Sequence, residues 1–223
     1  MMTSLKKYSF WYRNGLTLVF MTLFIFALGA QALTGFHVHN QDLKEAGYPA
    51  IALGTYLRSG HFLSATFENF ESEFLQMALY VLLTIKLRQV GSAESKSLSE
   101  KEEVDRLPQK GRHVPWPVKK GGWILKLYQN SLSICFVALF LTCWCLHGYG
   151  SWQENNIEQQ IKGLPRQSIL DYLCNAHFWF ESFQNWQSEF LSVASIVFFT
   201  IYLRQKGSPE SKPVDAPHFE TGK

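Results

Sequence analysis

The sequence has few charged residues and few cysteines, and each shortage excludes a class of protein. Charged residues make up 17% of the 223 residues, and the formal net charge is only +3. Because no stretch interleaves basic and aromatic residues as a groove-like surface would, we expect no nucleic-acid partner. We also expect no metal and no cofactor, because neither zinc-ligand spacing nor a disulfide framework is present among Cys135, Cys143, Cys145 and Cys174.

The sequence motifs of common enzyme classes are absent as well. The chain contains no nucleophile elbow, Walker loop, dinucleotide fingerprint or HExxH zinc motif. We therefore expect a protein that is not an enzyme. The question stays open at this stage, because an active site inside a membrane can rest on a few scattered polar residues.

Apolar and aromatic residues, by contrast, are plentiful and occur in long runs. Hydrophobic residues reach 47% and aromatic residues 15%, with 18 Phe and 7 Trp. Residues 16–33 and 132–149 approach the length of about 20 residues with which a helix crosses a bilayer. Residues 74–87 and 190–203 are shorter runs that also fit a buried helix of a soluble protein. They become long enough to span only when extended backward over Glu and Asn residues.

The chain also repeats itself. Shifted by 116 residues, the segment from Asn14 to Lys96 aligns without a gap with the segment from Asn130 to Lys212, and about a third of the aligned positions are identical. Both copies end alike, with LRQVGSAESK at residues 87–96 and LRQKGSPESK at residues 203–212. A period this long indicates a duplicated half of a domain rather than a solenoid.

These features predict an all-α integral membrane protein with four helices, built from two tandem two-span repeats in parallel orientation. The tail should be disordered because prolines stop the helix there and apolar residues are sparse. We expect the outer loops to be partly helical. The predicted parts are the first repeat (residues 1–92, spans at about 16–34 and 66–87), a charged cytoplasmic linker (93–123), the second repeat (124–208, spans at about 131–150 and 182–203), the tail (209–223), and helical turns within 49–59 and 165–175.

The distribution of basic residues favours one orientation. Most Lys and Arg residues precede the first span, lie in the linker or follow the last span, whereas the opposite loops carry only Lys44, Arg58, Lys162 and Arg166. The positive-inside rule then makes both termini cytoplasmic. The sequence thus predicts a multi-pass protein of the inner (plasma) membrane of the cell, surrounded by lipid.

A secretory signal peptide is a competing interpretation of the N-terminus. Basic residues and an apolar stretch precede Ala30-Gln31-Ala32, which resembles a cleavage site. The second copy has Leu146-His147-Gly148 at the equivalent position and cannot be a signal peptide. We therefore favour an uncleaved first span, and the sequence leaves cleavage undecided.

Basic and aromatic residues of the linker are candidates for contact with lipid headgroups. The alternative is an ordinary positively charged flank without a specific lipid site. The candidates are Lys110, Arg112, Trp116, Lys119 and Lys120.

One acidic residue in each copy, Glu73 and Glu189, is predicted to lie at the same depth in the membrane. Asn69 and Glu73, and likewise Asn185 and Glu189, are four residues apart and can share a helix face. A carboxylate deep in a membrane is a candidate for binding a proton or cation. The alternative is that these glutamates only form hydrogen bonds that hold the helices together. Charge at the neighbouring acids looks dispensable, because Glu68 and Glu71 become Gln184 and Gln187 in the second copy.

Histidines at the outer ends of the second helices are further candidates. His61 and His177 lie 12 residues before Glu73 and Glu189, about 18 Å along a continuous helix, so a His and a Glu of one helix cannot share a metal ion. A pair of His61 and His177, helped by His37 or His39, has no metal motif to support it. The plain alternative is a histidine at the membrane interface.

The repeated LRQxGSxESK endings, together with the Phe-x-Asn-aromatic-x-Ser-Glu-Phe pattern around Asn69 and Asn185, resemble a family of small bacterial multi-pass membrane proteins of unknown function. The likeness covers nearly the whole chain. It implies a location in the bacterial inner membrane, and it supplies no activity, substrate or site.

Two function classes follow from the sequence. The first is a transporter or channel for protons or small cations that uses Glu73 and Glu189. The second is a membrane scaffold or envelope-stress component that binds lipid or a partner protein. A homodimer or larger assembly of this chain is a reasonable expectation, because enclosing a water-lined path with so few spans usually needs more than one chain. The ion, the assembly size and the physiological role are not specified by the sequence.

Overall fold

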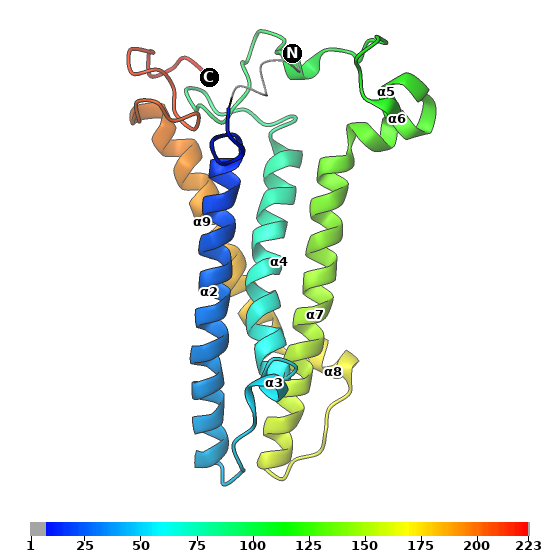
Figure 1. Ribbon diagram of the computed structural model, residues 1–223, viewed down its shortest axis with the longest axis vertical. Helices are drawn as coiled ribbons and strands as arrows, with labels where there is room; N and C mark the ends of the chain where they lie inside the picture. The colour runs from blue at the N-terminus through cyan, green and yellow to red at the C-terminus, as the bar shows by residue number, and fades with distance from the viewer. Residues whose placement is uncertain (1–7, 223) are drawn as a thin grey trace. The chain divides into compact units, whose positions relative to one another are not determined.

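The computed structural model describes residues 8–222, and all regular secondary structure among them is helical. The all-α prediction is therefore confirmed. The helices are α2 (Phe10–Glu45), α3 (Leu53–Tyr56), α4 (Gly60–Leu83), α5 (Trp116–Lys120), α6 (Gly122–Gln129), α7 (Ser131–Ile161), α8 (Ile169–Leu173) and α9 (Ala176–Tyr202), with a 3-10 turn at Glu103–Asp105 (Figure 1).

Polar side chains begin several of these helices. Ser168 accepts a hydrogen bond from the backbone of Asp171 at the start of α8, and Asn175 accepts one from the backbone of His177 at the start of α9. Ser9 caps α2 in the same manner. Such caps satisfy backbone N–H groups that lack a partner in the first turn. The short helices α3 and α8 lie where helical turns were expected in the outer loops.

Among the described residues, two helices, α2 and α7, are long and apolar enough to cross a membrane. None of the most apolar stretch of α2 is buried, and only 17% of that of α7 is. The core helix of a soluble protein would be mostly buried, so this exposure favours a membrane environment over water. Helices α4 and α9 have 24 and 27 residues but carry too much polar sequence to meet the same criterion. Four spans are thus not established.

The described residues form two compact units. Unit 1 contains the residues up to Leu63 together with Gly150–Arg166, and unit 2 contains Ser64–Tyr149 together with the residues from Gln167 onward. In unit 1, the Asn40 side chain pairs with the backbone of Ile51 through two hydrogen bonds, of 3.1 and 2.7 Å. This clamp holds the loop after α2 against the end of that helix.

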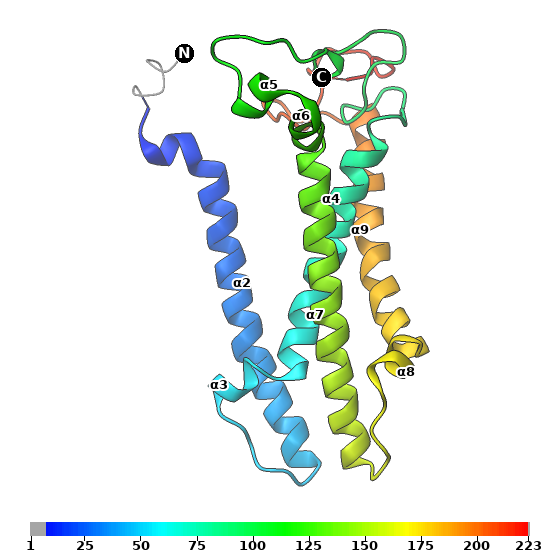
Figure 2. The ribbon, with the colours of Figure 1, turned by 90° about the vertical axis from the view of Figure 1, so that its right-hand side faces the viewer.

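In unit 2, helices α4 and α9 run in the same direction (Figures 1 and 2). The Asn185 amide donates to the Glu68 carboxylate, and Gln76 donates to Ser192 Oγ at 2.6 Å. The partners are 117 and 116 residues apart, which is close to the offset between the two copies. Equivalent positions of the two copies therefore meet along this helix pair.

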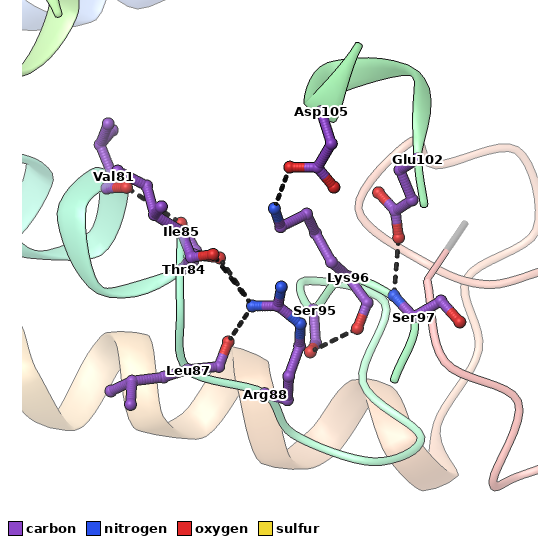
Figure 3. A network of polar contacts seen from close by, with 10 residues as sticks. All are labelled: Val81, Thr84, Ile85, Leu87, Arg88, Ser95, Lys96, Ser97, Glu102 and Asp105. Carbon is purple, nitrogen blue, oxygen red and sulfur yellow. Dashed lines mark hydrogen bonds and ion pairs between the residues drawn. The ribbon is translucent and has the colours of Figure 1, made fainter. Parts of the chain in front are cut away.

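The LRQxGSxESK segments end α4 and α9 with the same hydrogen bonds. Arg88 Nη1 donates to the carbonyls of Thr84, Ile85 and Leu87 (Figure 3), and Arg204 Nη1 donates to those of Thr200, Ile201 and Leu203. These groups bond to carbonyls in the last turn of α9 and directly after the last residues of α4 and α9, where carbonyls lack partners within a helix. Ser95 and Ser211 each accept the backbone N–H of the motif glutamine at 2.9 Å. The motif is thus a structural helix-ending loop.

The last residue of the motif is used differently in the two copies. Lys96 pairs with Asp105 of the linker at 2.6 Å (Figure 3). Lys212 is buried and donates to three backbone carbonyls of the tail, those of Pro217, His218 and Glu220. Burial lowers the pKa of the Lys212 ammonium. The tail has no helix, as its prolines suggested, but these bonds give it a defined path that its composition did not indicate.

A substitution at Gly60 tests the packing inside unit 1. A Cβ atom there would lie 2.6 Å from the Gly150 carbonyl oxygen and 2.8 Å from Gln153 Cβ, closer than such contacts allow. We expect Gly60→Ala to lower the free energy of unfolding by about 1–3 kcal/mol, the usual cost of overpacking. Thermal unfolding in detergent micelles measures it. Gly54→Ala, with nothing within 4 Å of the new atom, is the control; equal stability of the two variants would contradict the packing described.

The ion pair of Lys96 and Asp105 should make the linker sensitive to acid. The Lys96 ammonium, which donates a hydrogen bond to the carboxylate, lowers the pKa of Asp105 below its ordinary 3.8. A lowered pKa means that the pair stabilises the folded linker fully above pH 3.8 and is lost as the pH falls further. Hydrogen exchange at the Ser97 and Asp105 amides, corrected for intrinsic rates, should accelerate in that range.

A neutral variant separates this pair from other acids. Asp105→Asn should show the faster exchange already at pH 7, because the ammonium loses its partner. Glu103→Gln, which removes an exposed ion pair with Arg106, should not. Unchanged exchange in Asp105→Asn would show that the pair does not hold the linker.

Candidate functional site

The centre of unit 2 contains a fully buried pair of ionisable side chains. His147 on α7 and Glu71 on α4 are both 0% exposed, and His147 Nδ1 lies 3.0 Å from Glu71 Oε2. With the carboxylate ionised, the ring nitrogen Nδ1 carries the proton and donates it. Buried charges persist only when paired and hydrogen-bonded, so each side chain depends on the other.

Helix α9 supplies the remaining partners of the carboxylates on α4. Trp186 Nε1 donates to Glu71 Oε1 at 3.2 Å. Glu68, one turn earlier on α4, accepts the hydrogen bond from the Asn185 amide. Because Trp186 occupies Oε1 of Glu71, the oxygen facing His147 is the one available to take up a proton.

From His147 a row of ionisable groups leads to the surface of unit 2. His147 Nε2 lies 3.7 Å from Glu181 Oε2, and Glu181 Oε1 lies 3.4 Å from His177 Nδ1, one helical turn earlier on α9. The side chains of Glu181 and His177 are 26% and 69% exposed. We call Glu71, His147, Glu181 and His177 the histidine–glutamate chain; its exposure rises steadily from the buried end to the outer end.

Aromatic rings shield the buried end. The Phe178 ring is fully buried and its centre lies 5.1 Å from that of His147; it also contacts Trp144 and Tyr172. Within residues 8–222, His147 Nε2 is buried and accepts or donates no hydrogen bond. The ring therefore directs a nitrogen without a hydrogen-bond partner toward Glu181.

This geometry suits proton binding. A neutral imidazole that keeps its proton on Nδ1 can accept a second one on Nε2, and the resulting imidazolium lies between the carboxylates of Glu71 and Glu181. His177 is exposed and can exchange protons with water. Within the described residues, no group of three or more His, Cys, Asp or Glu side chains is arranged to hold a metal ion.

The four residues proposed from the sequence lie beside this chain rather than in it. Glu73 and Asn69 are exposed, and the Asn69 amide donates to the Ala65 carbonyl one turn back. Glu189 is half-buried, and its backbone carbonyl accepts a hydrogen bond from Gln76. Asn185 donates to Glu68 and to the Glu181 carbonyl. Both Asn amides therefore bond away from the glutamate that follows four residues later.

The two outer histidines have separate surroundings. His177 is the exposed end of the histidine–glutamate chain, whereas His61 belongs to unit 1. There His61 Nδ1 lies 3.2 Å from the Tyr56 hydroxyl, and its ring centre lies 4.9 Å from that of His39. His39 in turn lies 3.6 Å from Glu154. Burial, and secondarily Glu154, raises the pKa of the Tyr56 phenol.

The predicted lipid-interface residues lie on and before α5. Lys119 and Lys120 occupy its last turn, and Lys120 Nζ lies 5.2 Å from the centre of the Trp116 ring. The indole of Trp116 is exposed. Lys110 and Arg112 precede the helix.

Sequence reasoning missed Glu71, Glu68, His147 and Glu181. Glu71 and Glu68 were set aside because the second copy has glutamine at both positions, yet they are the acids that accept hydrogen bonds from α7 and α9. A signal was present: His147 of the second copy corresponds to Gln31, and Glu71 of the first copy corresponds to Gln187, so the counterparts of both members of the pair are glutamines. Such a joint change indicates positions that contact each other.

Within residues 8–222, helices and site together define an all-helical structure with two candidate membrane-spanning helices and a histidine–glutamate chain that runs from a buried to an exposed end. The chain belongs to the family described as domain of unknown function (DUF6766), which matches residues 7–223. The likeness to a family of unknown function is thus confirmed, and membership assigns no activity. Comparisons with curated proteins and with solved structures gave no match.

A double-mutant cycle tests the dependence of His147 and Glu71 on each other. Each single change, Glu71→Gln or His147→Gln, should destabilise the protein by about 3 kcal/mol, because it leaves a buried ionisable group without its partner. The double variant should be more stable than the sum of the two predicts, by about 1–3 kcal/mol. Unfolding in detergent micelles measures all three, and additive losses would contradict the pairing. Exposed Glu73→Gln is the control and should change stability by less than about 0.5 kcal/mol.

Proposed function

We propose that this protein is a multi-pass membrane protein that takes up protons from the outer side and relays them along the histidine–glutamate chain. The supporting observation is the row Glu71, His147, Glu181 and His177, linked by distances of 3.0, 3.7 and 3.4 Å and graded from fully buried to exposed. Intramembrane acids and histidines of this kind commonly mark proton pathways.

The relay has a defined order of steps. His177 takes a proton from water and passes it to Glu181, whose carboxyl group donates it to the vacant Nε2 of His147. The imidazolium then gives its Nδ1 proton to Glu71 Oε2. The starting state is restored once Glu71 has passed its proton on toward the inner half of the membrane and the proton left on His147 Nε2 has moved back to Nδ1. Trp186 holds the other oxygen of Glu71 and so keeps the accepting oxygen directed at His147.

The proposed topology has four spans, α2, α4, α7 and α9, with both termini in the cytoplasm and the protein in the inner membrane. The basic flanks support this orientation through the positive-inside rule. Glu71 lies 12 residues before Leu83 at the end of α4, about 18 Å, which is more than half of a core of about 30 Å. The relay thus covers the outer half of the membrane.

In the inner half of the membrane, the path can continue through the glutamates selected from the sequence. Gln76 bonds to Ser192 and to the Glu189 carbonyl, and Glu73 lies about one turn before Gln76. We propose Glu73 and Glu189 as the next proton acceptors, reached through water. A homo-oligomer would enclose such a path more completely, and the small number of helices supports it.

Proton flux in proteoliposomes tests the relay. With a potassium diffusion potential as driving force, the wild-type protein should acidify the lumen, equally well in sodium and in choline buffers. His147→Gln and Glu181→Gln should lower the rate at least tenfold, because each removes one link. Glu158→Gln is the control: this exposed acid on α7 pairs only with Lys162 among the contacts described, and its loss should leave the rate unchanged.

The outcomes separate the function classes. A sodium-dependent flux would favour a cation site over a proton relay. If the Glu73→Gln/Glu189→Gln variant loses flux while His147→Gln and Glu181→Gln keep it, the proton site would be the glutamate pair selected from the sequence. No flux above empty liposomes for folded wild-type protein at any pH would reject transport and favour a membrane scaffold.

A further inference from the structure

Unit 2 contains a groove between the later turns of α4 and α9 that the relay does not use. Its volume is about 450 Å³, within the range of about 300–1,000 Å³ typical of sites for small ligands. Its walls are mainly aliphatic and aromatic, from Leu79, Leu83, Phe190, Val193 and Val197. At one end the lining becomes polar, where Arg88, Gln89 and Ser95 of the first LRQxGSxESK segment begin.

The two motif arginines differ in what surrounds them. In Arg204, Nε donates to the Pro213 carbonyl and Nη2 to the Ala216 carbonyl, at 3.2 and 3.0 Å, so the tail occupies that side of the guanidinium. In Arg88, Nη1 makes the helix-capping bonds, and Nε and Nη2 make no hydrogen bond with any residue between 8 and 222 (Figure 3). The first copy thus lacks the oxygen acceptors that the second copy receives from its own chain.

We propose that this groove binds an acyl chain of an anionic phospholipid, whose phosphate accepts hydrogen bonds from Nε and Nη2 of Arg88. The apolar walls match an acyl chain, and the planar guanidinium matches a phosphate through two parallel bonds. The inference rests on the membrane location in the proposed function, because a lipid reaches this groove from the bilayer.

The nearby acid does not oppose a phosphate at this position. Glu94 accepts a hydrogen bond from the Tyr80 hydroxyl at 2.5 Å, which holds its carboxylate toward α4. Lys96 is paired with Asp105 and is not needed as a ligand. Arg88 is therefore the residue on which preference for an anionic headgroup depends.

Native mass spectrometry of the full-length protein in detergent, titrated with phosphatidylglycerol or phosphatidylcholine, tests the site. The wild-type protein should bind phosphatidylglycerol at least tenfold more tightly. Arg88→Gln should abolish this preference, whereas the matched change Arg204→Gln should keep it. Equal preference in wild type and Arg88→Gln would overturn the assignment. Glycerol phosphate, which lacks acyl chains, should not compete; competition would indicate a site for free phosphate instead.

A second pair of variants tests the groove itself. Ala194 lines it, and Ala194→Trp should weaken binding of both lipids at least tenfold by filling the space. Leu191→Trp, on the same helix at an exposed position outside the groove, should not. Undiminished binding in Ala194→Trp would overturn the proposal.

Proton flux of the same variants keeps the two proposals distinct. Arg88→Gln should retain flux if the lipid site and the relay are independent parts. Lipid preference without flux in the wild type would reject the relay and leave the lipid site standing, and flux without lipid preference would do the reverse.

Discussion

The arrangement of helices in unit 2 depends on one buried hydrogen bond, between His147 and Glu71. Both side chains are fully buried, and an unpaired charge in such surroundings costs several kcal/mol. The carboxylate therefore requires donors, and it obtains them from His147 on α7 and Trp186 on α9. Because the three groups come from three helices, satisfying one carboxylate restricts how α4, α7 and α9 can meet.

The outer surface of these helices explains why a polar contact has this importance. Large apolar side chains such as Leu141, Leu191 and Phe198 are exposed, and few are fully buried. In the proposed four-span topology, the surrounding lipid tails are as apolar as these side chains, so no hydrophobic force drives the helices together. Close packing and hydrogen bonds between helices must then specify the arrangement. Gln76 with Ser192 and Asn185 with Glu68 add to the specification along the α4 and α9 pair.

The sequence predicted the helices well and the site only in part. Apolar runs are local signals, so helices at the positions of α2 and α7 followed from them, and helical turns were expected where α3 and α8 lie. The functional candidates were chosen by identity between the two copies, which selected Glu73 and Glu189. That criterion favours residues with a role common to both copies and discards Glu71 and His147. Which polar side chains meet across three helices depends on helix rotation and packing, which periodicity alone does not determine.

Comparing the two copies also distinguishes polar residues that have a structural role from polar residues proposed to have a function. Arg88 and Arg204 cap their helices with the same bonds, because both helices must end. The buried pair of Glu71 and His147 is not repeated, since the equivalent positions are Gln187 and Gln31. Glutamine keeps the capacity to hydrogen-bond and removes the charge, so helix contact alone would be served by either residue. A buried ionisable pair is the more costly solution, and here it joins Glu71 of the first copy to His147 of the second. A proton-binding role requires such a pair, whereas a purely structural role does not.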